Sequence, residues 1–290
     1  MAPALRSPLV STQWLADHLG AEGLLVVDAT VLPFTQPNGS GGYLTGHEQY
    51  LVDGHVPGAV FADLIEEFSD PDAALKFTRP SVERFAAAAS ALGIAPGTTV
   101  VVYDSQQGQW AARFWWLLRA FGHEDSAVLD GGLTSWRAEG RDTETGHVEP
   151  VPAEFAAHER PELWADRSDV EAVLAGEREA ALVCALPRKD FSGEIAPRGR
   201  AGHIPGSVNA PAIELVDREA RTVRPEEELR GLFGSALDAP EVIVYCAAGI
   251  AATSAALALT VLGQRVAVYD GSLNEWTADP DAALETSVPA

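Results

Sequence analysis

Residues 242–249 read VIVYCAAG, and this stretch decides the fold. Four β-branched or aromatic residues in succession are typical of a strand that is buried on both faces. The strand pattern ends abruptly at Cys246, Gly249 follows in a short loop, and a helical pattern then covers residues 252–262. A strand, a tight loop and a helix in this order predict one step of a parallel α/β sheet.

The same step occurs earlier in the chain. Residues 100–104 read VVVYD, so that Asp104 stands at the end of a strand pattern as Cys246 does, with an offset of 142 residues (246 − 104). Further along, residues 128–133 (VLDGGL) match residues 268–273 (VYDGSL) with an offset of 140 (268 − 128). A nearly constant offset over some forty residues indicates a tandem duplication.

A second repeated motif lies upstream in each copy, where residues 54–58 read GHVPG and residues 202–206 read GHIPG. Short buried strand patterns alternate with amphipathic segments in both copies, which predicts an α/β fold with two domains, each a parallel sheet flanked by helices. Residues 143–158, with three prolines or glycines among polar residues, are predicted to be the linker. We place the boundary near Pro152 and expect domains at 1–150 and 151–290.

Composition restricts the function. The 290 residues carry a formal net charge of -22, which disfavours nucleic acid and anionic membranes as partners. Two cysteines cannot build a disulfide framework or a zinc cluster, so no metal is expected. No apolar run of membrane-spanning length and no targeting signature is seen, which predicts a cytoplasmic protein without a membrane partner.

Cys246 is the candidate nucleophile. Ligands of parallel α/β sheets lie beyond the carboxyl ends of the strands, and backbone amides at the start of a helix stabilise an anion there. A cradle of this kind favours a nucleophilic thiolate. A buried structural cysteine is the alternative, and it is our expectation for Cys184, at another strand end. The residues predicted to form the cradle are Ala247, Ala248, Gly249, Ile250, Ala251 and Ala252.

Three motifs of the second copy, VYCAAGI at residues 244–250, YDGSLNEW at 269–276 and GHIPGSVN at 202–209, resemble those of the tandem rhodanese family of thiosulfate and 3-mercaptopyruvate sulfurtransferases. The resemblance implies that the C-terminal domain is catalytic and that Cys246 carries the sulfur as a persulfide. It further implies a small anionic sulfur donor, cyanide or a thiol as acceptor, a sulfur-accepting protein as a further partner, and no cofactor. Asp104 cannot carry sulfur, so the N-terminal domain is expected to be the inactive copy.

The sequence departs from the family pattern around the expected site. Thiosulfate enzymes carry Arg and Lys after the cysteine and mercaptopyruvate enzymes carry Gly and Ser or Thr, whereas this chain has Ala247 and Ala248. The Ser-His-Asp relay of the mercaptopyruvate type is therefore incomplete, although Asp63 matches its aspartate. Asp190 stands where the family has a donor-binding arginine. Positive charge nearby comes from Arg188, Arg198 and Arg200, which we predict to bind the anionic donor.

Several other residues are expected to be structural. His55 and His203 occupy the same place in both copies, which favours a role in the turn over catalysis, and the same argument assigns Trp136 and Trp276 to the core. Arg113, beside three tryptophans, is a weak candidate for a site residue.

Two other functions are alternatives to sulfur transfer by a catalytic cysteine. A phosphatase of this fold needs Cys-x5-Arg, but the sixth residue after Cys246 is Ala252. A non-catalytic sulfur carrier, or a degenerate scaffold or sensor, remains the alternative to a sulfurtransferase, because fold alone does not fix activity.

Overall fold

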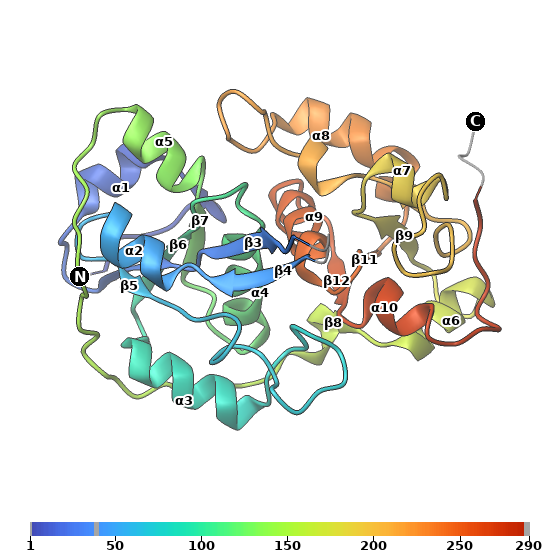
Figure 1. Cartoon of the computed structure of the whole chain (residues 1–290), viewed down its shortest axis with the longest axis horizontal. Coiled ribbons are helices and arrows are strands. Elements are labelled where there is room, and N and C mark those ends of the chain that lie inside the picture. Colours follow the sequence, from blue (N-terminus) through green and yellow to red (C-terminus); the bar gives the residue numbers. More distant parts are fainter. Residues whose placement is uncertain (1, 38–40, 287–290) are drawn as a thin grey trace. The chain divides into compact units, whose positions relative to one another are not determined.

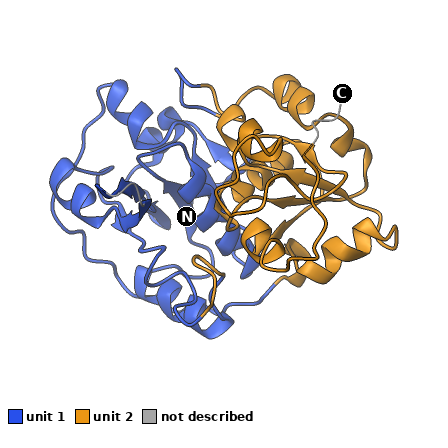
Figure 2. Cartoon of the chain, turned by 45° about the vertical axis from the view of Figure 1, so that its right-hand side comes forward, with its two compact units in different colours: residues 1–72, 79–159, 218–222 blue, residues 73–78, 160–217, 223–290 orange. Residues whose placement is uncertain are grey.

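The computed structural model describes residues 2–37 and 41–286 as two compact units (Figure 2). Unit 1 comprises residues 1–72, 79–159 and 218–222, and unit 2 comprises residues 73–78, 160–217 and 223–290. The units follow the predicted duplication, while the contacts assign residues 151–159 to unit 1 and each half contributes a short segment to the unit built mainly by the other.

Unit 1 is built on a five-stranded sheet in which every neighbouring pair of strands is parallel (Figure 1). The spatial order is β1-β7-β6-β2-β5. Because parallel strands are covered by helices on both faces, β6 is fully buried along its length. The strands are β1 (Leu9–Val10), β2 (Leu24–Asp28), β5 (Val60–Phe61), β6 (Thr99–Tyr103) and β7 (Ser126–Leu129).

The helices of unit 1 begin and end at residues suited to those positions. Ser11 and Ser81 accept backbone N–H groups at the starts of α1 and α3, and Gly93, with a left-handed φ of 92°, ends α3. The helices are α1 (Thr12–His18), α2 (His47–Asp53), α3 (Val82–Leu92), α4 (Gln109–Ala120) and α5 (Gly132–Ala138). A separate antiparallel pair, β3 (Val31–Thr35) and β4 (Gly41–Thr45), completes the unit.

Unit 2 repeats this architecture. Its five-stranded parallel sheet has the order β10-β9-β11-β12-β8. Read from β8 to β10, this is the order of unit 1 with each strand replaced by its counterpart in the second copy. The strands are β8 (Trp164–Ala165), β9 (Ala181–Cys184), β10 (Val208–Asn209), β11 (Val242–Tyr245) and β12 (Val266–Tyr269). The α-helices are α6 (Arg167–Leu174), α7 (Arg188–Phe191), α8 (Glu226–Phe233), α9 (Ile250–Val261) and α10 (Ser272–Trp276). The predicted fold class is confirmed.

Each unit is closed by an irregular segment after its last helix. In unit 1, Trp136 donates from Nε1 to the carbonyl of Asp142, and Glu144 exchanges backbone hydrogen bonds with His55. The predicted linker thus runs along unit 1, and Ala153 bonds to α3 further on. In unit 2 the counterparts are Trp276 donating to Ala283, and Glu285 pairing with His203. Both segments tie the repeated Gly-His turn to the end of their own copy.

The cores contain the apolar faces of the central strands and of α4 and α9, each of which is 12 residues long. Trp136 and Trp276 are both 2% exposed, in agreement with the predicted core role. Among the helices of residues 2–37 and 41–286, none has the length and apolar character needed to cross a membrane.

Candidate active site

Cys246 lies directly after β11, at the carboxyl end of the central strand of unit 2. Cys246 is 2% exposed, whereas Ala247, Ala248 and Ala251, which follow it in the chain, are partly exposed. Gly249 caps α9 with a left-handed φ of 76°, a conformation that glycine adopts readily. The chain therefore turns from strand to helix through the four residues 246–249, and Cys246 is buried at the start of this loop.

The loop is fastened at both ends by the beginning of α10. The Ser272 hydroxyl oxygen accepts the N–H groups of Cys246 (3.1 Å) and Gly249 (3.2 Å). In the other direction, the amides of Leu273 and Asn274 donate to the carbonyls of Cys246 and Ala247. Sequence reasoning used the Asp-Gly-Ser motif as a repeat marker and missed Ser272 as a site residue. The signal available was the replacement of Gly132 in the first copy by a residue with a hydroxyl.

Two amides in the first turn of α9 are available to donate hydrogen bonds. Within the described part of the chain, the N–H groups of Ala251 and Ala252 have no hydrogen-bond acceptor. Amides in the first turn of a helix have no acceptor in the helix itself, and together they attract negative charge. The loop thus combines a buried sulfur with donors that an added anionic sulfur atom would satisfy.

Unit 1 contains the same cradle with an anion already in it. The carboxylate of Asp104, 1% exposed, accepts the N–H groups of Gln106, Gly108, Trp110 and Ala111 at 2.8 to 3.0 Å. The last two lie in the first turn of α4, as Ala251 and Ala252 do in α9. The loop in unit 1 is one residue longer, which gives the carboxylate room to fold back onto it. In the first copy, four backbone amides of the loop and of the helix start thus converge on one carboxyl group.

Cys184 occupies a different environment. It ends β9, pairs in register with Tyr245 and is completely buried. Burial raises the pKa of Cys184 to about 12, so this thiol stays protonated at neutral pH. A protonated, buried thiol is a poor nucleophile, in keeping with its expected packing role.

The three arginines predicted to bind the donor each have a partner within the chain. Arg188 forms a two-pronged pair with Glu214 (2.8 and 2.5 Å), and Arg200 donates to the carbonyls of Asp279 and Ala282 (both 2.6 Å). Arg200 therefore fastens the segment that closes unit 2.

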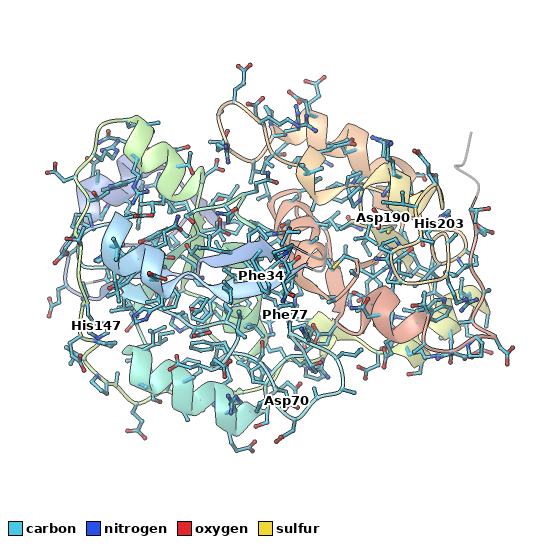
Figure 3. The ribbon with its side chains drawn as sticks, in the orientation of Figure 1. Phe34, Asp70, Phe77, His147, Asp190 and His203 are labelled. Carbon is cyan, nitrogen blue, oxygen red and sulfur yellow. The ribbon has the colours of Figure 1, made fainter. Side chains whose placement is uncertain are left out.

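Arg198 differs from the other two. It pairs with Asp190 of α7, which is labelled in Figure 3, at 3.2 Å. Both side chains are largely buried. Its Nε atom is buried and has no hydrogen-bond partner among the described residues. Asp190, which stands where the resemblance predicts an arginine, thus forms an ion pair with one of the three predicted cations.

The two histidines expected to be structural lie within hydrogen-bonding distance of backbone carbonyls, whereas Asp63, which matches the relay aspartate, and Arg113, a candidate site residue, both lie in unit 1. Nδ1 of His55 lies 3.0 Å from the carbonyl of Tyr50, and Nδ1 of His203 lies 2.7 Å from that of Phe191, on whose ring it stacks. Asp63 accepts the amides of Ile65 and Glu66 in a local turn of unit 1. Arg113, on α4, is buried in unit 1.

Comparisons with known proteins agree with the fold and the motifs. The Rhodanese-like domain family matches residues 11–139 and 185–279. The 3-mercaptopyruvate sulfurtransferase of Escherichia coli K12 is 36% identical over 283 residues, covering 95% of this chain and 97% of the relative. Its human namesake is 34% identical over 288 residues, with 95% and 93% covered.

Other relatives carry both substrate names. The Arabidopsis thaliana thiosulfate/3-mercaptopyruvate sulfurtransferase 2 is 35% identical, with 96% of this chain and 86% of the relative covered. A crystal structure of a 3-mercaptopyruvate sulfotransferase from E. coli superposes with a TM-score of 0.79 at 34% identity, over 92% of this chain and 98% of that one.

The fold and the duplicated strand-loop-helix define a two-domain rhodanese-like protein. The chain belongs to the tandem-domain rhodanese family of 3-mercaptopyruvate/thiosulfate sulfurtransferases, and it is a sulfurtransferase that works on a small sulfur donor and acceptor.

Proposed function

We propose that the chain transfers a sulfane sulfur through a persulfide on Cys246. The observation that carries this proposal is the difference between the two cradles. In unit 1 the carboxylate of Asp104 accepts the first-turn amides of α4, whereas in unit 2 the amides of Ala251 and Ala252 have no acceptor within residues 2–37 and 41–286. A terminal persulfide sulfur on Cys246 supplies the missing negative charge.

The reaction has two balanced halves. The Cys246 thiolate attacks the sulfur of the donor, forms an S–S bond, and the donor remainder leaves with the electron pair of the broken bond, as sulfite from thiosulfate or as pyruvate, after protonation, from 3-mercaptopyruvate. The acceptor, a thiolate or cyanide, then attacks the outer sulfur and the Cys246 thiolate leaves. Backbone amides stabilise the anionic sulfur, as in an oxyanion hole.

The electrostatics favour a donor with little negative charge. The loop itself carries no cation, and Arg188, Arg198 and Arg200 are each paired within unit 2. Thiosulfate is a compact dianion, and each missing charged hydrogen bond weakens its binding by about 1.5 to 3 kcal/mol. We therefore propose 3-mercaptopyruvate or an organic persulfide as the better donor, with a cytoplasmic thiol as acceptor.

Mass spectrometry of the intact chain tests the proposal. After incubation with thiosulfate, 3-mercaptopyruvate or an organic persulfide, wild type and Cys184→Ser should gain one sulfur mass, and Cys246→Ser should gain none. Turnover with thiosulfate should be slow and have a high KM. A sulfur adduct that survives in Cys246→Ser and disappears in Cys184→Ser would move the site to β9. A wild-type chain that gains no sulfur from any donor would support the non-catalytic alternative.

A further inference from the structure

Ser272 is the first residue of α10, and it is completely buried in an unfavourable backbone conformation. Its φ is +51°, in the left-handed region that residues with a Cβ adopt at an energetic cost of roughly 1 to 3 kcal/mol. At the equivalent position unit 1 has Gly132, with a φ of +55°. A Cβ added there would lie 2.5 Å from the carbonyl oxygen of Asp104. Unit 1 thus avoids the strain, and unit 2 accepts it together with a hydroxyl.

The hydroxyl of Ser272 has all its hydrogen-bonding capacity committed. It donates to the carbonyl of Tyr269 at 2.7 Å and accepts the amides of Cys246 and Gly249. Because its hydrogen is used within the chain, the hydroxyl is not a donor to the sulfur. It fixes the two ends of the loop at 246 and 249, and so acts on the sulfur only through the backbone.

The following residues of α10 set the orientation of the peptide groups between those ends. Leu273 and Asn274 donate to the carbonyls of Cys246 and Ala247 at 3.1 and 3.0 Å, which turns both carbonyls toward α10. In a trans peptide the N–H points opposite to the carbonyl, so the amides of Ala247 and Ala248 point away from α10. The bonds from α10 therefore keep carbonyl oxygens, which repel an anion, directed away from the donor side of the loop.

We propose that Ser272 is a positioning residue for sulfur transfer, holding the loop in the one conformation that leaves its amides available to the persulfide. This inference rests on the proposed role of Cys246. It explains why unit 2 has a strained serine where unit 1 has glycine. In both units the helix after the last strand donates to the carbonyl of the first loop residue, but the loop amides of unit 1 donate to the Asp104 carboxylate, whereas those of unit 2 donate to the Ser272 hydroxyl.

Two variants of the full-length chain separate loop positioning from stability. Ser272→Gly removes the hydroxyl and the strain together, and Ser272→Ala removes the hydroxyl alone. Loss of the two hydrogen bonds that the loop amides donate to the hydroxyl should shorten the lifetime of the sulfur adduct and lower kcat by about tenfold in both variants. The Tm of Ser272→Gly should stay near that of wild type, because relief of strain offsets the lost bonds. Ser126→Ala, which removes a buried serine hydroxyl in unit 1, is the control and should change neither the lifetime of the sulfur adduct nor kcat.

The possible outcomes are distinct. A wild-type chain that forms no adduct on Cys246 removes the proposed function itself. An adduct with wild-type lifetime and turnover in Ser272→Gly would leave that function standing and overturn the role of Ser272. A loss of adduct that follows the fall in Tm in both variants would assign Ser272 a purely structural role, and it too would overturn the proposal.

Discussion

Two carboxyl groups at the end of the unit 1 sheet are buried where unit 2 has its two cysteines. Asp28 ends β2 beside Asp104, as Cys184 ends β9 beside Cys246. Burial raises the pKa of Asp28 to about 6, although the amide of Thr30 donates to its carboxylate. Residue identity thus sets the chemistry of one shared position: a carboxyl group with a raised pKa in one copy and a protonated thiol in the other.

The raised pKa of Asp28 makes stability depend on pH. A group with a raised folded-state pKa contributes stability that is present below its unfolded pKa and is lost as pH rises through the folded value. Because the pKa rises from the ordinary value of 3.8 to about 6, the free energy of unfolding falls by on the order of 3 kcal/mol between about pH 4 and pH 6. Urea unfolding from pH 4.5 to 7.5 should show this decline in wild type and a flatter profile in Asp28→Asn. Asp72→Asn, at an exposed site, should follow wild type, and parallel profiles for wild type and Asp28→Asn would contradict the assignment.

At the scale of the element, the loop before α4 is organised by one side chain. Burial raises the pKa of Asp104, yet its carboxylate accepts four amides that would otherwise have no partner. Asp104→Ala should lower the free energy of unfolding by at least about 3 kcal/mol, since buried donors lose a charged acceptor. Added sulfate should restore part of the Tm in this variant and have less effect on wild type. Asp63→Ala, which frees two amides of a turn, should lower the free energy of unfolding by about 1 kcal/mol. Equal losses in the two variants would show that the loop before α4 does not require an anionic acceptor more than an ordinary turn does.

The elements also show what sequence alone can predict. Local patterns of apolar residues and turns predict the sheets, their duplication and the position of Cys246, because these patterns occur twice in the chain. The contacts of Arg200 and Ser272 cannot be predicted in this way, because they depend on the folded path of the backbone. The Arg200 guanidinium donates to the carbonyls of Asp279 and Ala282, and the Ser272 hydroxyl accepts amides 26 and 23 residues away. For the same reason the segment at 143–158 was predicted as a linker, although its irregular backbone is hydrogen-bonded to unit 1.

At the scale of the whole molecule, charge opposes the substrate. Acidic side chains outnumber basic ones by 42 to 20, so the chain presents a negative field to any anionic donor. Raising the ionic strength from 0.01 to 0.15 M shortens the Debye length from about 30 to about 8 Å and screens this repulsion. We therefore expect kcat/KM for thiosulfate to rise by roughly three- to tenfold over this range.

Comparing the salt dependence of kcat/KM for two donors separates the effect of the net charge of the chain from the chemistry of the loop. 3-Mercaptopyruvate carries one carboxylate, so its kcat/KM should rise less than that of the dianion when the acceptor is held constant. Sodium chloride and choline chloride should act alike, because screening depends on ionic strength and not on the cation. If instead kcat/KM for thiosulfate falls as salt is added, fixed cations close to Cys246 outweigh the field of the whole chain. Arg198, whose side chain is largely buried, would then have to be released from Asp190 to meet the donor, and Asp190→Asn would be expected to improve the use of thiosulfate.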